Sequence, residues 1–207
     1  MIDKALHDFL IIWATIDPIG TMALFVGLTA NLSIKDRRKT AYKTIVYAAL
    51  ILIGAIVIGQ VLLAAMGISL LSFQIAGGVI LFLFGLQMIF SQGSTEATAE
   101  ARHDISVFPL AIPSTASPGA ILAVILITDN HVYTIEEQVV TTITMLFVLV
   151  VTLVLLLLSN TIIKVIGVGG ASLLTRLMGM ILAALSVEFI MEALGLEQWV
   201  TSASVSF

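Results

Sequence analysis

The sequence predicts an all-α, polytopic membrane protein with six transmembrane helices. Hydrophobic residues make up 59% of the 207 residues and charged residues 11%, whereas about a quarter of a typical soluble domain is charged. A helix needs roughly 20 predominantly apolar residues to cross the hydrocarbon core of a bilayer. Six segments meet this requirement, at about residues 7–29, 43–66, 70–91, 105–127, 138–159 and 173–194.

The connections between these spans are expected to be short turns. Residues 164–172 are rich in glycine and indicate a turn between the fifth and sixth spans, and Gly67 marks the corresponding turn in the first half. The beginning of the chain has neither a basic region nor a clean small-x-small cleavage site, so we expect no removable signal peptide. The chain is predicted to form a single transmembrane domain over residues 1–207.

Basic residues predict the direction of insertion. Eight of the nine lysines and arginines fall on one side of the predicted bilayer, and Lys4 alone falls on the other. The eight are Lys35, Arg37, Arg38, Lys39, Lys43, Arg102, Lys164 and Arg176. Because lysine and arginine are enriched in cytoplasmic loops, both termini are predicted to lie outside. The basic cluster at 35–43 is interpreted as a topology signal rather than a ligand site.

Two short breaks interrupt the first and fourth apolar segments, at residues 17–20 and 113–119. Proline and glycine free backbone groups that lipid cannot satisfy, so such breaks persist where protein or a watery cavity covers them. A matching pair in two halves of a chain points to a transporter's binding site. We predict repeats over about 5–91 and 105–195, inverted because each contains three spans, with helices 1 and 4 broken near the midplane.

Each break has the features of a helix that restarts. Asp17 and Ser117 are favoured N-cap residues, and Pro18 and Pro118 suit the first helical position. A restart leaves free N–H groups and the positive end of a helix dipole, and two facing restarts form a site for an anion. We therefore predict a small zwitterionic substrate, with its carboxylate between the restarts and Asp17 balancing its ammonium group or taking a proton.

The predicted substrate-binding residues belong to these breaks or adjoin them. They are Thr15, Asp17, Pro18, Gly20, Thr21, Ser114, Thr115, Ser117, Pro118 and Gly119. Three alternatives stay open at this point. Hydroxyls in a span often only bond the carbonyls of their own helix, prolines can kink a helix without touching a ligand, and Asp17 can serve purely as a cap.

Two carboxylates inside the spans, Asp17 and Glu188, are the candidates for coupling to an ion, either H⁺ or Na⁺. A charge at mid-bilayer costs about 3 kcal/mol on insertion scales, so such residues are usually functional. Glu188 alternatively reaches the water outside. Gln60, Gln74 and Gln87 are interpreted mainly as hydrogen-bond partners between helices.

Other classes of function are disfavoured. The chain has no cysteine, and its three histidines are too scattered for a metal site. The serines and threonines of the breaks lack a buried histidine or lysine base. We predict no enzyme activity, no cofactor and no metal. Without a basic stripe we expect no nucleic acid partner, so the partners are the lipid bilayer and the substrate, and an oligomer is compatible with the sequence.

Several motifs together resemble one family. In order they are Asp17-Pro-Ile-Gly, Ala23-Leu-Phe, Asp36-Arg-Arg, Ile75-Ala-Gly-Gly, Phe108-Pro-Leu-Ala-Ile-Pro, Pro118-Gly-Ala and Arg176-Leu-Met-Gly. This pattern is similar to the MarC family of six-span inner-membrane proteins, which includes SnatA-type transporters. The resemblance implies transport of glycine, alanine and similar small neutral amino acids, driven by an ion gradient. The alternatives are a channel or facilitator for a small solute, and a non-transporting membrane partner or sensor.

Overall fold

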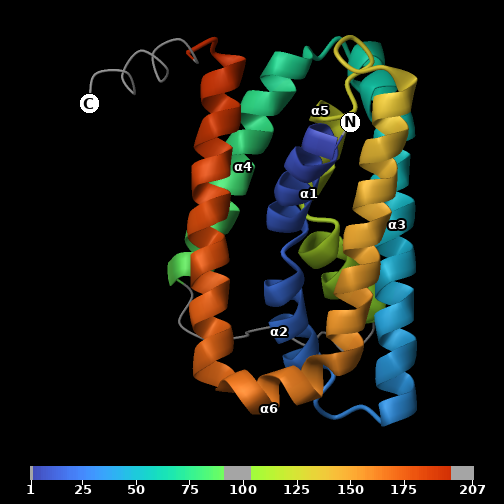
Figure 1. Ribbon diagram of the computed structural model, residues 1–207, viewed down its shortest axis with the longest axis vertical. Helices are drawn as coiled ribbons and strands as arrows, with labels where there is room; N and C mark the ends of the chain where they lie inside the picture. Colours follow the sequence, from blue (N-terminus) through green and yellow to red (C-terminus); the bar gives the residue numbers. More distant parts are fainter. Residues whose placement is uncertain (1, 91–103, 197–207) are drawn as a thin grey trace.

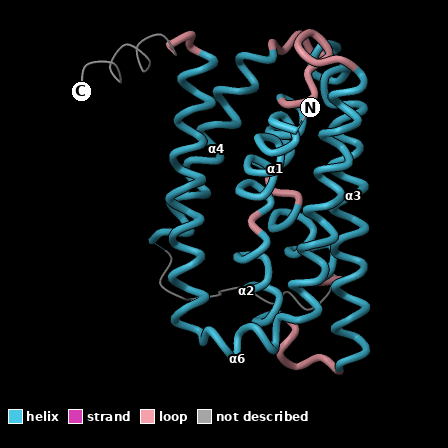
Figure 2. The backbone as a smooth tube through the Cα atoms, viewed as in Figure 1, coloured by secondary structure: helices cyan, strands magenta, loops and turns pink. Residues whose placement is uncertain are grey.

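The computed structural model describes residues 2–90 and 104–196, and every regular element in these two ranges is a helix (Figures 1 and 2). The elements are α1 (Ile2–Ile16), α2 (Pro18–Leu28), α3 (Ile34–Ala65), α4 (Leu70–Phe90), η1 (Ser106–Thr115), α5 (Pro118–Leu126) and α6 (Ile135–Ala193). The predicted all-α class is confirmed.

Five segments are long and apolar enough to cross a membrane. They are Asp3–Leu28, Ile34–Ala65, Leu70–Phe90, Ile135–Gly167 and Gly169–Ala193. The predicted fourth span corresponds to η1 and α5, which meet at an angle of 52° and pass the same test only as a pair. The protein is therefore a multi-pass membrane protein, and its fourth predicted span has a different form from the other five.

The basic segment that was expected as a loop is the beginning of α3. The prediction that this helix begins near residue 43 was wrong, because Ser33 caps it at residue 34 and accepts a hydrogen bond from the Asp36 amide at 3.1 Å. Asp36 also favours a helix here, since an acidic side chain in the first turn complements the helix dipole. Arg37 and Lys43 therefore project from a helix, and Arg102 lies outside the described residues.

The turn predicted between the fifth and sixth spans is present as a kink at Gly167, with helix on both sides of it. Helix α6 runs from Ile135 to Ala193, and Gly167 is its single residue with non-helical angles, φ 69° and ψ 168°. Gly67, after α3, has almost the same φ of 68°. Glycine suits both positions because positive φ strains residues that have a Cβ. Figure 1 shows α6 descending, crossing the lower end of the molecule and returning upward.

Segment η1 winds more widely than an α-helix and is interrupted at Phe108 and Ile112, where the backbone is extended. Each of these residues precedes a proline, and the proline ring disfavours helical angles in the residue before it. The entry to η1 is fixed by Asp104, which accepts hydrogen bonds from the amide and hydroxyl of Ser106. The hydrogen bond from Lys43, with the Ser106 bonds, lowers the pKa of Asp104 to about 2.

Helices α4 and α6 pack closely through small residues. A methyl group added at Gly179 would lie 2.8 Å from the Gly85 carbonyl oxygen, and one added at Gly85 would lie 2.8 Å from that of Gly179. Such backbone proximity replaces the hydrophobic drive for helix association in lipid. Large apolar side chains on α3, including Val57 and Val61, are instead mostly exposed, which is appropriate for a face in contact with lipid.

The start of α1 and the end of α6 lie toward the same end of the molecule, the upper end in Figure 1. The α2–α3 connection and the crossing part of α6 lie at the lower end. This arrangement agrees with termini on one side of a bilayer. Arg37 connects two elements at the lower end, donating to Asn160 and to the Ser159 hydroxyl of α6.

Candidate functional site

Both predicted helix breaks are present, and each has the predicted cap. Between α1 and α2, the Asp17 carboxylate accepts a hydrogen bond from the Gly20 amide at 3.1 Å, and Pro18 occupies the first helical position. Between η1 and α5, the Ser117 hydroxyl accepts from the Ala120 amide at 2.9 Å. These local features could be predicted because a cap and a proline act over only a few residues.

The two breaks touch each other. The Thr21 and Ser114 hydroxyl oxygens lie 2.9 Å apart in a hydrogen bond between α2 and η1. The Ser117 hydroxyl donates to the Thr15 carbonyl at 2.8 Å and so joins α1 to the start of α5. The interruption of both helices thus brings four polar residues from opposite halves of the chain into two hydrogen-bonded contacts.

A cavity of about 160 Å³ opens beside this contact, and we call it the break cavity. Its lining contains four of the predicted residues, Asp17, Gly20, Thr21 and Ser114. Its remaining walls are Leu24, Phe84, Met88, Pro109, Pro113 and Thr175. A cavity of about 150 Å³ holds a benzene molecule, so the break cavity has room for a small amino acid.

Asp17 is the main charged group of the break cavity. It is 4% exposed, and its backbone adopts the left-handed conformation with φ 47° and ψ 70°. Aspartate is one of the few residues besides glycine that tolerates this region. One oxygen, Oδ1, accepts from the Gly20 amide, and among the described residues Oδ2 has no hydrogen-bond donor. The carboxylate can therefore accept a donor from a ligand.

Other predicted site residues do not line the break cavity. Thr15 donates to the Ile11 carbonyl at 2.8 Å, and Thr115 donates to the Leu110 carbonyl at 2.9 Å. Pro18, Ser117 and Gly119 are buried, and Pro118 is exposed away from the cavity lining. Thr15 and Thr115 therefore follow the alternative in which a hydroxyl bonds only a carbonyl of its own element.

The backbone amides of the two restarts are largely engaged. The Gly20 and Ala120 amides bond the cap side chains, and the Thr21 and Ile121 amides bond the carbonyls of Asp17 and Ser117. The prolines have no N–H at all. A ligand carboxylate would therefore rely mainly on hydroxyl donors in this cavity, and Thr21 and Ser114 are the two that face each other there.

Sequence reasoning missed the walls from α4 and α6. Phe84, Met88 and Thr175 reach the break cavity because α4 and the second half of α6 pack against the broken helices. Long-range packing of this kind leaves no local signal. Pro109 and Pro113 did carry a signal, since both belong to the proline-rich fourth segment.

A second, larger cavity of about 530 Å³ lies at the end of the molecule where α1 begins and α6 ends, and we call it the upper cavity. It is lined by residues of α1, α4, α5, the α5–α6 connection and the end of α6, including Gln74, Asp129, Tyr133, Glu188 and Glu192. Glu188, a predicted ion-coupling residue, is exposed here and lies far along α6 from the Thr175 wall of the break cavity.

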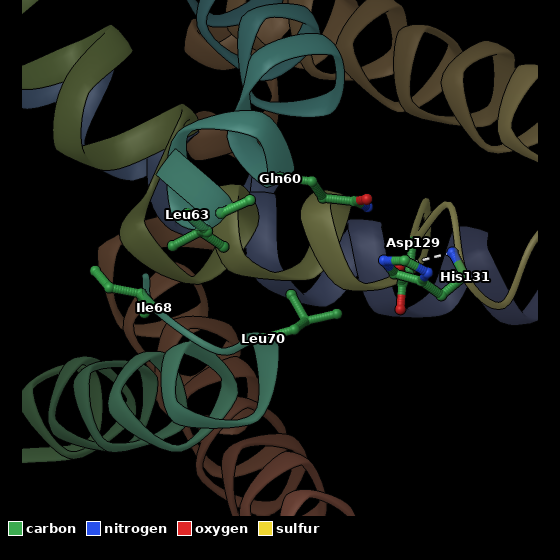
Figure 3. Close-up of a pocket in the computed structure, with 7 residues that line it drawn as sticks. Gln60, Leu63, Ile68, Leu70, Asp129 and His131 are labelled. Atoms are coloured by element: carbon green, nitrogen blue, oxygen red, sulfur yellow. Dashed lines mark hydrogen bonds between the residues drawn. The ribbon is translucent and has the colours of Figure 1, made fainter. Parts of the chain in front are cut away.

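A side pocket of about 130 Å³ adjoins the upper cavity (Figure 3). The two share Leu70 and Asp129. Gln60 lines this pocket and donates to the Thr128 carbonyl at 3.0 Å, while its own oxygen accepts from the Asn130 amide. Gln60 thus joins α3 to the end of α5, as predicted for an interhelical partner. Gln74 also joins two helices, whereas Gln87 is exposed.

Apolar side chains separate the break cavity from the upper cavity. Leu81 of α4 packs on Gly119, where an added methyl group would lie 2.2 Å from Leu81 Cδ1. Leu122 of α5 packs on Gly77 in the same way. Leu81, Leu122 and Leu182 are completely buried. We call these three leucines the seal, since they lie between the two cavities along α4, α5 and α6.

Lys4 and Asp8 form a further polar contact that sequence reasoning missed. Asp8 is 1% exposed and pairs with Lys4 at 3.1 Å, and it also accepts from the Thr141 hydroxyl. Lys4 lies 3.7 Å from the centre of the Tyr133 ring and donates to the Ile127 carbonyl. The spacing of Lys4 and Asp8, one helical turn apart, was the available signal. This contact holds α1 against α5 and α6.

The bundle of long apolar helices identifies an integral membrane protein. Its two helix breaks are in contact, and it has one cavity beside them and another at its upper end. The model of the MarC family integral membrane proteins matches residues 2–198. The chain belongs to the MarC family, as its motifs had indicated.

Relatives of known name agree with this assignment. The UPF0056 inner membrane protein MarC of Salmonella arizonae is 33% identical over 190 residues, which cover 84% of this chain and 86% of the relative. A UPF0056 membrane protein of Methanocaldococcus jannaschii is 32% identical over 191 residues, covering 88% and 92%. The first name supports the predicted location in the inner membrane. No solved structure matches the chain.

Proposed function

We propose that this protein is a secondary transporter of the inner membrane that moves small neutral amino acids of the glycine and alanine type, driven by an H⁺ or Na⁺ gradient. The observation that carries the proposal is the break cavity. A buried carboxylate and the hydroxyls of Thr21, Ser114 and Thr175 line a space of about 160 Å³ where two interrupted helices meet, and its other side chains are apolar. This combination suits a molecule with an ammonium group, a carboxylate and a short side chain.

In the proposed binding mode, side chains rather than the amides of helix ends hold the charged groups of the substrate. Asp17 Oδ2 accepts from the ammonium group, and the Thr21 and Ser114 hydroxyls release each other to donate to the carboxylate. The walls from Leu24, Phe84 and Met88 limit the side chain. Gly20 keeps the backbone close to the Asp17 carboxylate. Asp17 is also the proposed coupling residue, and no enzyme activity, metal or cofactor is part of this proposal.

The proposal includes six spans in two inverted repeats of three, with η1 and α5 together as the fourth span and both termini outside. The matched caps at Asp17 and Ser117 and the matched positive φ at Gly67 and Gly167 support it. In this arrangement the breaks lie near the bilayer midplane, which is the usual place for a transporter's site.

The seal favours a transporter over an open channel. Two cavities approach each other from opposite ends of α4, and buried leucines lie between them. Alternating access requires a closed barrier of this kind. It opens when α4 and the second half of α6 rock against the broken helices. A continuous channel would need a polar path through Leu81 and Leu122.

The test is uptake of labelled glycine and alanine into proteoliposomes, with a proton gradient, a sodium gradient or neither. The proposal predicts saturable uptake that one gradient stimulates, together with counterflow of unlabelled substrate. Flux without saturation or counterflow would favour a facilitator. The absence of any flux under all three conditions would contradict transport and favour a membrane partner or sensor.

A further inference from the structure

The polar lining of the upper cavity is mainly acidic, and His7 and Tyr133 also contribute polar side chains to it. Asp129, Glu188 and Glu192 contribute three carboxylates, and Gln74 contributes an amide. The lining contains neither lysine nor arginine. Acidic residues alone do not make a binding site, because solvent can satisfy them at a surface. The stronger evidence for a binding site comes from the two most buried of these residues, Gln74 and Asp129.

Gln74 and Asp129 are buried but incompletely bonded. Their exposed fractions are 6% and 7%. Gln74 donates its amide to Glu192 at 2.9 Å, and Asp129 Oδ1 accepts from the His131 amide at 2.9 Å (Figure 3). In residues 2–90 and 104–196, Gln74 Oε1 and Asp129 Oδ2 have no donor.

These two oxygens have access to the cavity they line. Within the described part of the chain, no completely enclosed side-chain oxygen or nitrogen lacks a hydrogen-bond partner. Gln74 Oε1 and Asp129 Oδ2 therefore retain some accessible surface, and both residues line the upper cavity. Both oxygens can therefore accept hydrogen bonds from a ligand that brings N–H donors into the cavity in place of solvent.

Lys4, a basic residue at this end, is already engaged. Lys4 pairs with Asp8, donates to the Ile127 carbonyl and lies over the Tyr133 ring. It is therefore not available to neutralise Asp129 or Glu188. The lining of the upper cavity keeps an excess of negative charge, which attracts a cationic group.

The spacing of the acceptors favours an organic cation over a metal ion. Among the described residues, no three aspartate, glutamate or histidine side chains lie close enough together to hold a metal ion. An ammonium group on a small organic molecule has several donors and tolerates separated acceptors. The cavity volume of about 530 Å³ exceeds what a single ion needs.

We infer that the upper cavity is a recognition site for the ammonium group of a small amino acid, which binds there before or after it occupies the break cavity. The inference deepens the proposed function and depends on it only for the identity of the amino acid. The site selects molecules that carry an ammonium group and disfavours anions. The seal at Leu81 and Leu122 then separates this first site from Asp17.

The experiment measures binding of glycinamide, which has an ammonium group and no carboxylate, by calorimetry with the purified protein in nanodiscs. Asp17→Asn is the starting variant, so that the break cavity has no carboxylate. This variant should bind glycinamide and not acetate. Adding Glu188→Gln should weaken glycinamide binding roughly tenfold or more, since a hydrogen bond to a charged group contributes enough for that change.

Glu136→Gln is the matched control, because Glu136 is an exposed carboxylate near the same end that does not line the cavity. Asp129→Asn is a second test variant, and its Oδ1 can still accept from His131. Three results would overturn the inference: no glycinamide binding by Asp17→Asn, equal binding with and without Glu188→Gln and Asp129→Asn, or acetate binding as tight as glycinamide.

The same measurements separate this inference from the transport proposal. Loss of glycinamide binding on Glu188→Gln, in a protein whose proteoliposomes transport no amino acid, would support the ammonium site and contradict the transporter. Transport that is unchanged by Glu188→Gln and Asp129→Asn, with unchanged glycinamide binding, would support the transporter and contradict the ammonium site.

Discussion

The two helix breaks share a sequence pattern but differ in what they offer a ligand. At the first, Asp17 caps α2 from a left-handed backbone and its carboxylate lines the break cavity. At the second, Ser117 caps α5 from an extended backbone, is completely buried and donates to the Thr15 carbonyl. Of the two matched caps, one therefore faces a cavity and the other is bonded only within the protein.

The difference follows from side-chain chemistry at the caps. Aspartate has two oxygens, so one can hold the Gly20 amide while the other remains available. Serine has one oxygen, and it both accepts from Ala120 and donates to Thr15. In the second break the residue available to a ligand is therefore Ser114, which lies outside the cap and bonds Thr21. The following predictions test this division of roles.

The largest effect is expected for Asp17→Asn. Asparagine is as good an N-cap as aspartate, so α2 should keep its start, but the negative charge in the break cavity is lost. A hydrogen bond to a charged group contributes about 1.5–3 kcal/mol, and about 1.4 kcal/mol is a tenfold change in affinity. Alanine uptake by proteoliposomes should fall roughly tenfold or more, with an unchanged unfolding temperature. Asp3→Asn, at an exposed carboxylate of α1, is the control.

Gly20→Ala should reduce uptake through Asp17. A methyl group at residue 20 would lie 1.9 Å from Asp17 Oδ2, so the carboxylate must move away from its present position. We expect a clear loss of alanine uptake, smaller than that of Asp17→Asn because the charge remains. Gly27→Ala is the matched control, since a methyl group there meets no atom within 4 Å. Equal uptake by both variants would mean that the position of Asp17 is unimportant.

Ser117→Ala should lower stability rather than recognition. The change removes the cap of α5 and the bond to the Thr15 carbonyl, and loss of an N-cap costs about 0.5–2 kcal/mol. Thermal unfolding in detergent should occur at a lower temperature, while the KM for alanine stays near that of the unchanged protein. A large rise in KM with no change in unfolding temperature would assign Ser117 to the substrate instead.

The smallest effects are expected for Thr15→Val and Thr115→Val. Both hydroxyls bond carbonyls of their own elements and do not line the break cavity. Valine preserves the shape of the side chain, so we expect changes in uptake within about twofold and in stability within about 1 kcal/mol. A loss of uptake as large as that of Asp17→Asn would place these hydroxyls in contact with the substrate.

The features that could be predicted from sequence are those with local causes. The apolar spans, both caps and both interruptions follow from runs of apolar residues and from the pairs Asp17-Pro18 and Ser117-Pro118. The prediction failed at residues 35–43, where polarity suggested a loop, whereas the turn predicted within 164–172 is present as a kink at Gly167. The cap at Ser33 extends α3, and a single residue, Gly167, is enough to redirect α6.

Only the part of the break cavity formed by the two helix breaks could be predicted from the sequence. Asp17, Gly20, Thr21 and Ser114 could be identified because they belong to the breaks. Their opposing wall depends on how Gly85 and Gly179 allow α4 and α6 to approach, and that contact joins residues far apart in the chain. The upper cavity likewise lies between the ends of several helices. The sequence therefore gave no indication that Asp129 and Gln74 line the same cavity.

The most direct test of the central claim uses the absence of native cysteine. A cysteine placed by Ser114→Cys lines the break cavity, and its reaction with a small thiol reagent reports access to that space. Gly27→Cys, outside the cavity, is the control. If substrate binds where the two breaks meet, alanine should slow the labelling at residue 114 in a saturable manner and leave that at residue 27 unchanged. Labelling at residue 114 that is indifferent to alanine and glycine at every concentration would contradict the account.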